Sequence, residues 1–317
     1  MRAIFLGTPQ FAVPTLDRLI AAGHQIPLVV TQPDRPKGRG NSLAMPPVKE
    51  SALRHSLEVF QPERVRRPES VERLRAVAPE IMVIVGYGQI LPQSILDIAP
   101  RGILNVHASL LPKYRGAAPI QWAIANGETS TGVTIMRIDA GLDTGDILSK
   151  AETPIGGDET AVELSPRLAE MGAGLLVETL PQLDSITPEK QDDSAATYAP
   201  ILKKEDGAID WNRPAREIHN RIRGLQPWPG AYSSFRGQTL HVWKSAVTGD
   251  HSPHPPGTLL LDRRRLYATA GDGLFLELRE VQSEDRKRLP GDVFANGARL
   301  GPHELLSRAP EQAVRKS

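Results

Sequence analysis

The 317-residue chain contains no cysteine. Disulfides, thiolate nucleophiles, cysteine-ligated zinc and iron–sulfur clusters are therefore excluded, and the absence is consistent with a reducing compartment. No apolar run approaches the roughly 20 residues of a membrane span, and the apolar stretch at the N-terminus is too short for the core of a signal peptide. We therefore expect a cytoplasmic protein that makes no membrane contact.

The chain also lacks a net charge that would identify a partner, because 38 Lys+Arg and 37 Asp+Glu leave a formal charge of +1. The charge is uneven along the chain. From Lys203 onward, 19 basic and 14 acidic residues give +5, whereas the preceding residues carry −4. A basic C-terminal part indicates a polyanionic partner, although ordinary surface variation explains the difference equally well.

Several common catalytic motifs are missing. There is no Walker phosphate loop, no HExxH zinc helix and no G-x-S-x-G nucleophile elbow. The nearest match to a dinucleotide fingerprint is GYGQIL at residues 86–91, which lacks the third glycine. Glycines after a buried strand let a ligand approach the backbone, or they form a tight exit from the strand, and both interpretations stay open.

The first half of the chain alternates short apolar runs with helical patterns. Most of the runs are apolar throughout, as in parallel sheets covered by helices on both faces. The predicted strands are residues 3–6, 26–31, 81–85, 102–106 and 132–138. The predicted helices are residues 12–20, 71–78 and 162–180. Pro166, Gly172 and Gly174 weaken or break the last of them. The fold class is therefore α/β, with a doubly wound, mostly parallel, Rossmann-like sheet.

The pattern changes after residue 180, where the polar stretch 188–194 is typical of a linker. A helix at 214–224 and short β-type segments at 239–243, 257–261, 266–270 and 274–278 predict a small C-terminal β-barrel or sandwich. We accordingly predict an N-terminal domain of residues 1–187, a linker of residues 188–206 and a C-terminal domain of residues 207–317. Trp211, Trp228 and Trp243 are expected in the core of the C-terminal domain rather than stacked on bases.

Two polar residues stand at the end of the predicted strand 102–106. Asn105 and His107 share one face because strand side chains alternate, and they lie at the sheet edge where open α/β folds bind ligands. A histidine can transfer a proton near neutral pH and an amide can stabilise a developing oxyanion, so the pair suits attack on a carbonyl. Alone, such a pair is more often two satisfied capping side chains.

An acidic loop, DAGLDTGD at residues 139–146, follows the predicted strand 132–138. Asp143 is the candidate carboxylate that would fix the tautomer of His107, raise its pKa and accept a proton. Asp and Gly are also ordinary turn residues, so a purely structural loop is the alternative. A metal loop ranks last, because the acidic spacing does not match an EF-hand and no histidine adjoins it.

These residues together resemble the folate-dependent formyltransferases in order and in spacing: Asn105-x-His107, SLLP at 109–112 and DTGD at 143–146. Chance agreement of all three in one α/β domain is remote. Further segments resemble the members that formylate initiator methionyl-tRNA, and the likeness covers nearly the whole chain. They are GTPQF at 7–11, TQPDRPKGRG at 31–40, YRGAAPIQW at 114–122 and GLDTGD at 141–146. The purine-pathway relative shares the catalytic trio but usually ends after the first domain.

The resemblance implies a monomeric enzyme without a metal that moves the formyl group of 10-formyltetrahydrofolate to the α-amino group of methionine on initiator tRNA. Asn105 and His107 would donate hydrogen bonds to the developing alkoxide, and Asp143 would orient His107 and accept the amine proton. The residues that would border the folate are Ser109, Leu110, Leu111, Pro112, Gly86, Tyr87, Gly88 and Ile90.

The basic segment 33–47 has no helical or strand period, and on its charge alone it would be a solvated loop. The resemblance implies that it contacts the acceptor stem of tRNA through Arg39, with Lys37 and Arg35 beside it. The C-terminal domain would be an OB-like tRNA-binding module, and Lys204 would be a further contact near the linker.

Three other functions are compatible with parts of this sequence. A nucleotide-sugar amine N-formyltransferase has the same trio and a C-terminal β domain, but the basic segment around Arg39 argues against it. An RNA-binding protein that has lost its activity would be expected to lack one of the three catalytic residues. A formylfolate hydrolase would be expected to carry a regulatory N-terminal domain, which no part of the chain resembles.

Overall fold

The computed structural model describes residues 1–37, 42–302 and 304–307. The chain forms two compact units, each assembled from separate stretches of sequence. The first unit comprises Met1–Pro119, Ser130–Thr153 and Ser165–Pro200, and the second comprises Ile120–Thr129, Pro154–Leu164 and Ile201–Ser317. The domain boundaries drawn from composition at residues 187 and 206 stay predictions.

The first unit is built on one sheet with the strand order β10-β9-β7-β6-β1-β2-β5. Its strands are β1 (Arg2–Gly7), β2 (Gln25–Val30), β5 (Val59–Phe60), β6 (Ile81–Val85), β7 (Ile103–His107), β9 (Ser130–Arg137) and β10 (Ile147–Pro154). Neighbours from β5 to β7 are parallel, which confirms the predicted mostly parallel sheet. The predicted strand at 132–138 is present as β9, and it is an exception to the parallel pairing. β9 pairs antiparallel with β7 and is apolar because both of its faces are buried, whatever its direction.

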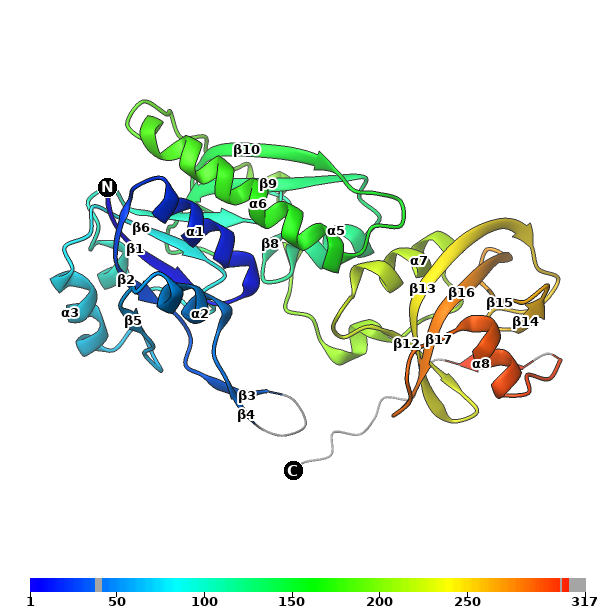
Figure 1. The fold of residues 1–317 in the computed structure, drawn as a ribbon. Helices are drawn as coiled ribbons and strands as arrows, with labels where there is room; N and C mark the ends of the chain where they lie inside the picture. The colour runs from blue at the N-terminus through cyan, green and yellow to red at the C-terminus, as the bar shows by residue number, and fades with distance from the viewer. Residues whose placement is uncertain (38–41, 303, 308–317) are drawn as a thin grey trace. The chain divides into compact units, whose positions relative to one another are not determined.

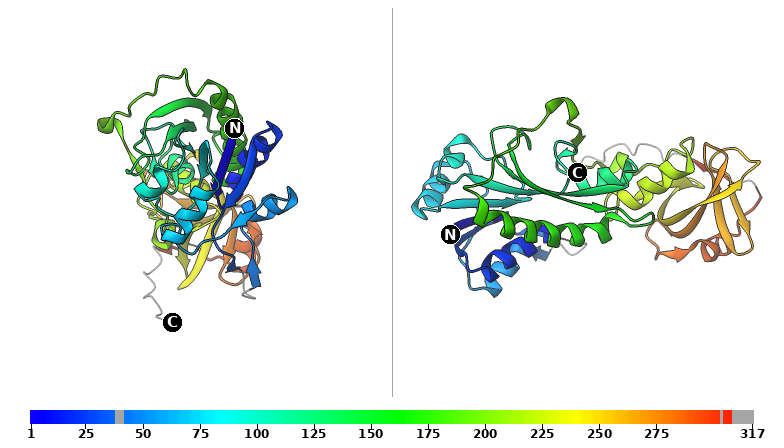
Figure 2. Two further views of the ribbon diagram at one scale, coloured as in Figure 1. Left: turned by 90° about the vertical axis from the view of Figure 1, so that its left-hand side faces the viewer. Right: turned by 90° about the horizontal axis from the view of Figure 1, so that it is seen from above.

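Helices cover both faces of this sheet, as Figures 1 and 2 show. α1 (Val13–Ala21), α2 (Pro47–Arg54) and α6 (Ala161–Thr179) pack on one face, and α3 (Pro68–Ala76) and α4 (Gln93–Leu96) pack on the other. Alternating apolar side chains of the strands fill these two layers. The arrangement confirms the doubly wound fold.

The expectation of a break in the helix at 162–180 is wrong, because α6 is continuous. Pro166 lies in its second turn and gives up only one backbone hydrogen bond there. Gly172 faces β7, where an added Cβ would come within 2.5 Å of Val106 Cγ1. The glycine that lowers helix propensity is therefore the residue that lets α6 approach the sheet closely.

Two short strands lie in the segment 33–47, for which the sequence shows no strand period. β3 (Arg35–Lys37) and β4 (Ser42–Ala44) pair antiparallel. The prediction of an aperiodic loop is wrong for these residues. The sequence of β3 and β4 shows no apolar–polar alternation because this pair of strands does not bury one face, as the 73% exposure of Leu43 shows.

The second unit is built on a curved antiparallel sheet with the strand order β14-β15-β16-β13-β12-β18, and β17 pairs with β16. Its strands are β12 (Ala231–Phe235), β13 (Gln238–His251), β14 (Leu259–Asp262), β15 (Arg265–Thr269), β16 (Leu274–Ser283), β17 (Leu289–Pro290) and β18 (Leu306–Ser307). Shifts in the register of β13 against β16 bend this long strand. The unit also contains α5 (Pro119–Ala125), whereas α7 (Ala215–Gly224) and α8 (Gly291–Gly297) contribute to its core. The expected small C-terminal β domain is confirmed, and its curved sheet is antiparallel.

Two of the three tryptophans expected in this core are buried, since Trp211 and Trp243 are 4% and 9% exposed. The expectation is wrong for Trp228, which is 54% exposed. Trp228 lies in the turn between α7 and β12, outside the strands whose inner faces build the core. Within the part of the chain that the structure describes, no helix combines the length and the apolar character that a membrane span requires.

Candidate active site

Asn105 and His107 occupy the carboxyl-terminal end of β7, two residues apart and on the same side of the strand. Both are buried, at 8% and 5% exposure. The neighbouring strands hold them in register, with Ile84 of β6 beside Asn105 and Thr134 of β9 beside His107. They therefore lie at the predicted edge of the sheet, where open α/β folds bind their ligands.

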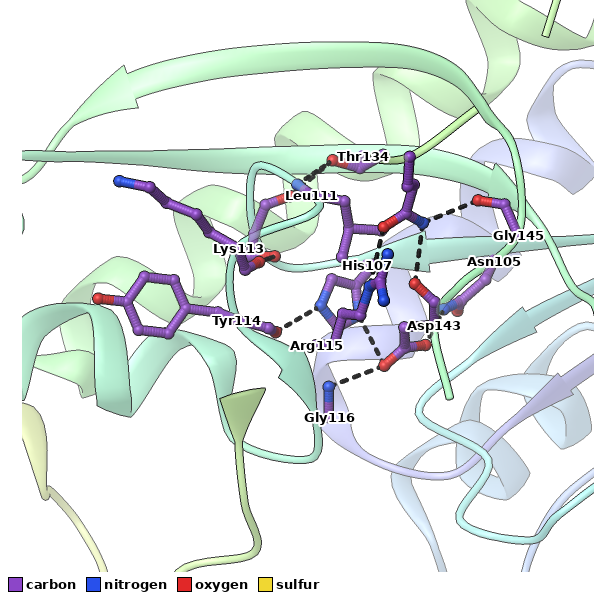
Figure 3. A network of polar contacts seen from close by, with 12 residues as sticks. Asn105, His107, Leu111, Lys113, Tyr114, Arg115, Gly116, Thr134, Asp143 and Gly145 are labelled. Carbon is purple, nitrogen blue, oxygen red and sulfur yellow. Dashed lines mark hydrogen bonds and ion pairs between the residues drawn. The ribbon is translucent and has the colours of Figure 1, made fainter. Parts of the chain in front are cut away.

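Asp143 reaches both residues from the loop that follows β9 (Figure 3). Its Oδ1 accepts a hydrogen bond from Asn105 Nδ2 at 3.4 Å, and its Oδ2 lies 3.7 Å from His107 Nδ1. The same Oδ2 accepts from the backbone N–H of Gly116 at 2.9 Å. The three residues predicted from two separate motifs thus form one cluster around a single carboxylate.

The ring of His107 has one nitrogen in a defined role. Nε2 lies 3.0 Å from the carbonyl oxygen of Tyr114, and since a carbonyl only accepts, Nε2 carries a proton. Nδ1 is then the nitrogen that faces the Asp143 carboxylate. A proton can therefore pass between this nitrogen and the carboxylate during a reaction.

The conformation of the acidic loop is set by its own side chains. Asp139 Oδ1 accepts from the backbone N–H of Gly141 at 2.9 Å and from Thr144 Oγ1 at 2.7 Å, so Asp139 is a turn-capping residue. Asp143 has a φ of +52°, in the left-handed region that few non-glycine residues adopt. In residues 1–37, 42–302 and 304–307, no three His, Asp or Glu side chains are grouped as they would be to hold a metal ion.

Two polar residues that hold this loop, Gln191 directly and Arg115 through Gln191, are not predicted from the sequence. Arg115, in β8 (Arg115–Gly116), is 2% exposed. Its Nε donates to the side-chain oxygen of Gln191 at 3.0 Å, and the amide nitrogen of Gln191 donates to the carbonyl of Asp143 at 2.8 Å. Arg115 lies in the YRGAAP segment that the family resemblance includes, whereas Gln191 lies in a stretch that composition marks as a linker.

The SLLP segment after β7 divides into supporting and accessible residues. Ser109 is fully buried and its Oγ donates to the carbonyl of Lys113 at 2.6 Å, while the side chain of Leu111 is 1% exposed. Leu110 and Pro112 are partly exposed. Ser109 and Leu111 therefore support the loop from within, and Leu110 and Pro112 have side-chain surface that a ligand can touch.

The loop after β6 contains two glycines, which leave its backbone uncovered by side chains, and one exposed apolar side chain, that of Ile90. Gly86 and Gly88 have φ values of +55° and +86°, which favour glycine. The ring of Tyr87 is buried, and burial raises the pKa of its phenol. The carbonyl of Tyr87 accepts from Gln32 Nε2 at 3.1 Å, whereas Ile90 is 91% exposed.

A depression of about 540 Å³ adjoins this loop. It is lined by Gln32, Glu63, Arg64, Arg66, Gly88, Gln89, Ile90 and Pro92. Its volume is within the usual range of small-molecule sites, and two arginines and the exposed Ile90 offer it charge and apolar contact. Of the four residues predicted from this loop, Gly88 and Ile90 line the depression, and Gly86 and Tyr87 do not.

Two family profiles match the chain. One, described as "Formyl transferase", matches residues 1–180, and the other, described as "Formyl transferase, C-terminal domain", matches residues 201–299. The chain belongs to the formyl transferase family. This formyltransferase is 63% identical over 308 residues to the methionyl-tRNA formyltransferase of Solibacter usitatus, a match that covers 96% of this chain and 98% of that protein. It is 51% identical over 311 residues to the methionyl-tRNA formyltransferase of Geobacter sulfurreducens, covering 98% of each.

Solved structures share the fold of this formyltransferase at low identity. An N-formyltransferase from Helicobacter canadensis, in complex with folinic acid and dTDP-3-aminofucose, superposes with a TM-score of 0.68 at 20% identity and covers 90% of this chain and 100% of that one. HypX from Aquifex aeolicus, in complex with tetrahydrofolic acid, superposes with a TM-score of 0.61 at 17% identity and covers 96% of this chain and 48% of that one. These likenesses establish the fold.

The residues of this formyltransferase that were assigned to tRNA lie apart from the Asp143 cluster in sequence. Arg35 opens β3, is exposed, and forms an ion pair with Glu63 at 3.6 Å. Lys37 ends β3, and Arg39 lies outside the described residues. Lys204 is exposed at the start of a 3-10 turn, Lys204–Gly207, in the second unit. Arg35 and Lys204 therefore present their charge at the surface.

Proposed function

We propose that this protein transfers the formyl group of 10-formyltetrahydrofolate to the α-amino group of methionine on initiator tRNA. The observation that carries the proposal is the 63% identity to the Solibacter usitatus methionyl-tRNA formyltransferase across 96% of this chain. Because 98% of that relative is matched, the likeness extends over both parts of the chain. The products are N-formylmethionyl-tRNA, which serves translation initiation, and tetrahydrofolate.

The Asp143 cluster supplies the groups that this reaction needs. One N–H of the Asn105 amide is directed at Asp143 Oδ1, and we assign the other to the formyl oxygen as negative charge develops on it. The bond from the amine nitrogen to the formyl carbon forms, and the bond from that carbon to the folate nitrogen breaks. Asp143 receives the proton that the amine loses and passes it to Nδ1 of His107, and His107 delivers that proton to the leaving nitrogen.

We assign the folate to the surface between the loop after β6 and the SLLP segment. The backbone at Gly86 and Gly88 lets a flat ring approach closely, because these residues carry no side chain. Ile90, Leu110 and Pro112 offer apolar contact. Tyr87, Ser109 and Leu111 act through the backbone that their buried side chains hold in place.

We assign the tRNA acceptor stem to the segment around β3 and β4, with Arg35, Lys37 and Arg39 contacting its phosphates or bases. Lys204 is a further contact to the tRNA near the linker, and the second unit is a tRNA-binding module. The excess of basic residues from Lys203 onward favours both assignments. The protein acts as a monomer in the cytoplasm, where translation initiates, and makes no membrane contact.

Transfer to the amine of a nucleotide sugar is the alternative, and the neighbour from Helicobacter canadensis with a bound amino-sugar nucleotide is its basis. That neighbour is 20% identical to this chain, against 63% for the methionyl-tRNA formyltransferase of Solibacter usitatus. The comparison favours tRNA as the acceptor.

The proposal is tested by a formyl-transfer assay with purified protein and 10-formyltetrahydrofolate. Charged initiator methionyl-tRNA, free methionine and an amino-sugar nucleotide are offered separately as acceptors, each with and without uncharged tRNA as competitor. We expect transfer to the charged tRNA alone and inhibition by the competitor. Transfer to the sugar alone, or hydrolysis of the formyl donor without any acceptor, contradicts the proposal.

A further inference from the structure

Gln191 makes hydrogen bonds with its entire side-chain amide. Its Nε2 donates to the carbonyl of Asp143 at 2.8 Å and to the carbonyl of Gly145 at 2.8 Å. Its Oε1 accepts from Arg115 Nε at 3.0 Å. Two of these bonds join Gln191, which follows α6 in the chain, to the loop that carries Asp143, and the third joins it to Arg115 of β8.

The chemistry around Gln191 admits only a carboxamide. Two carbonyl oxygens accept hydrogen bonds and one guanidinium donates, so the amide nitrogen must face the carbonyls and the amide oxygen must face Arg115. A carboxylate of the same shape would bring an oxygen against both carbonyls and leave them without a donor. The arrangement therefore depends on the identity of the side chain as well as on its size.

The loop that Gln191 contacts is under conformational strain. Asp143 has left-handed dihedrals, which an aspartate adopts at a cost in free energy. Gly145 leaves no room for a side chain, since a Cβ there would lie 1.9 Å from the carbonyl oxygen of Arg137. Such a conformation persists only where its surroundings hold it, and the bonds from Gln191 hold the carbonyls on both sides of Thr144.

A second path leads from Gln191 to the carboxylate of Asp143. Arg115 is buried and is followed by Gly116, whose N–H donates to Asp143 Oδ2 at 2.9 Å (Figure 3). The backbone of this segment is itself fixed, because Arg115 N donates to the carbonyl of Thr197 at 2.9 Å. Gln191 therefore acts on the backbone of Asp143 directly and on its carboxylate through Arg115 and Gly116.

We propose that Gln191 is a positioning residue for the reaction, which holds the carboxylate of Asp143 in reach of His107. This inference rests on the proposed function, because it assigns a consequence to the placement of Asp143. Gln191 is not itself directed at His107 or Asn105. Its removal therefore slows the chemical step and leaves the binding of both substrates nearly unchanged.

The test compares Gln191→Glu and Gln191→Met with the unaltered full-length protein. Glutamate keeps the shape of the side chain but puts an acceptor oxygen where the donor Nε2 of Gln191 stands. Methionine keeps the length of the side chain and makes none of the three hydrogen bonds. We expect kcat to fall by about 10- to 100-fold in both variants, the loss that a displacement of a catalytic group by about 1 Å produces. The KM values for methionyl-tRNA and for the formyl donor are expected within about twofold of the original.

The matched control is Gln182→Glu, the same chemical change at an exposed glutamine of the first unit. Among the residues that the structure describes, the side chain of Gln182 makes one long hydrogen bond, from its Nε2 to the carbonyl of Glu178 at 3.4 Å. We expect this variant to keep the original kcat, KM values and thermal unfolding midpoint. A fall in kcat equal to that of Gln191→Glu would show that added negative charge, not the position, is responsible, and would overturn the proposal.

Amide hydrogen exchange provides a readout that needs no activity. We expect faster exchange over residues 139–146 in Gln191→Met and Gln191→Glu, and unchanged exchange in Gln182→Glu. If the unaltered protein formylates no tRNA, the proposed function fails while this measurement still decides whether Gln191 holds the loop. An unchanged kcat, unchanged exchange in this loop, or global unfolding of both Gln191 variants overturns the positioning role.

Discussion

The two carboxylate oxygens of Asp143 contact three neighbouring residues. Oδ1 faces the amide of Asn105, and Oδ2 is shared between the backbone N–H of Gly116 and the ring of His107. An N–H that loses its partner in a buried place costs about 1–3 kcal/mol. Both oxygens are needed as acceptors, so the carboxylate determines the geometry of the site as well as its charge.

Replacing Asp143 by Asn keeps the shape of the side chain and removes one acceptor and the charge. The new NH₂ group must face either the Asn105 amide or the Gly116 N–H, and both are donors. We expect Asp143→Asn to lower kcat by about 10²-fold or more, and His107→Ala to do the same, with tRNA affinity nearly intact. Steady-state kinetics and a tRNA filter-binding assay measure the two quantities.

The control for this prediction is Asp97→Asn, the same change at an exposed carboxylate that accepts from Gln93 Nε2. It is expected to leave kcat unchanged. Loss of tRNA binding in Asp143→Asn or His107→Ala together with loss of kcat would identify these residues as structural and contradict their catalytic assignment.

At the scale of elements, the sequence predicts the long strands of the first unit that are buried on both faces and misses β10, which is not. β6 has the predicted bounds because all five of its residues are apolar and buried. β10 is not predicted, since this edge strand alternates between buried and exposed positions and carries Ser149, Lys150 and Glu152. A strand at the edge of a sheet needs fewer apolar residues than a central strand, and its edge position is fixed only when the sheet is assembled. Such a strand is therefore harder to predict from the sequence.

The residues of the site also differ in how far the sequence predicts them. Asn105 and His107 are predictable because they are neighbours in one strand, and the place of Asp143 follows from its loop. Gln191 is 48 residues from Asp143 in the chain and lies in a polar stretch that composition cannot distinguish from a linker. Only the tertiary fold, in which β11 (Tyr198–Ala199) pairs with β8, brings that stretch to the site.

The hairpin of β3 and β4 is attached to the first unit by a small polar network. Lys49 Nζ donates to both oxygens of Asp34 at 2.9 and 2.7 Å, and Gln61 Nε2 donates to Asp34 Oδ1 at 2.7 Å. The bond from Gln61, followed by that from Lys49, lowers the pKa of Asp34. Asp34 immediately precedes β3, so this network sets the direction in which the hairpin leaves the unit.

Removing the amine of Lys49 should loosen the hairpin without disturbing the Asp143 cluster. We expect Lys49→Met to raise the KM for methionyl-tRNA about three- to tenfold, which corresponds to about 1 kcal/mol for a partly buried ion pair. The KM for the formyl donor and kcat are expected to stay unchanged. Initial rates at varied tRNA concentration provide the measurement.

Lys150→Met is the matched control, because it removes the same charge from an ion pair with Glu189 at 3.5 Å on β10. If both variants raise the KM for tRNA equally, the effect is one of overall charge. The assignment of the hairpin to tRNA is then without support from this network.

At the scale of the whole molecule, one buried histidine, His219, and one half-buried histidine, His241, make the second unit sensitive to acid. His219 Nδ1 lies 3.0 Å from Ser245 Oγ and Nε2 lies 3.2 Å from the carbonyl of Gly157. His241 stacks on Trp243 with 5.6 Å between ring centroids. Burial is the main cause that lowers the pKa of both histidines. The charged groups that face His219 are Asp158, Arg216 and Arg223, and those that face His241 are Lys204, Glu284 and Arg288.

The sign of the effect follows from proton uptake. A histidine with a lowered pKa in the folded state stays neutral there below pH 6.5, where the unfolded chain takes up a proton. Its contribution to stability is therefore present above about pH 6.5 and is lost as the pH falls. Each proton taken up only on unfolding lowers the free energy of unfolding by at most about 1.4 kcal/mol per pH unit.

We expect the unfolding midpoint of the second unit to fall by a few °C between pH 7.5 and pH 5, and His219→Gln to flatten that fall. Gln is neutral at both pH values and still offers a donor to the carbonyl of Gly157. His251→Gln is the control, because His251 is exposed. Calorimetric scans of the full chain at several pH values give the slopes. A slope for His219→Gln equal to that of the unaltered protein and of His251→Gln would show that His219 is protonated equally in the folded and unfolded states, contrary to its burial.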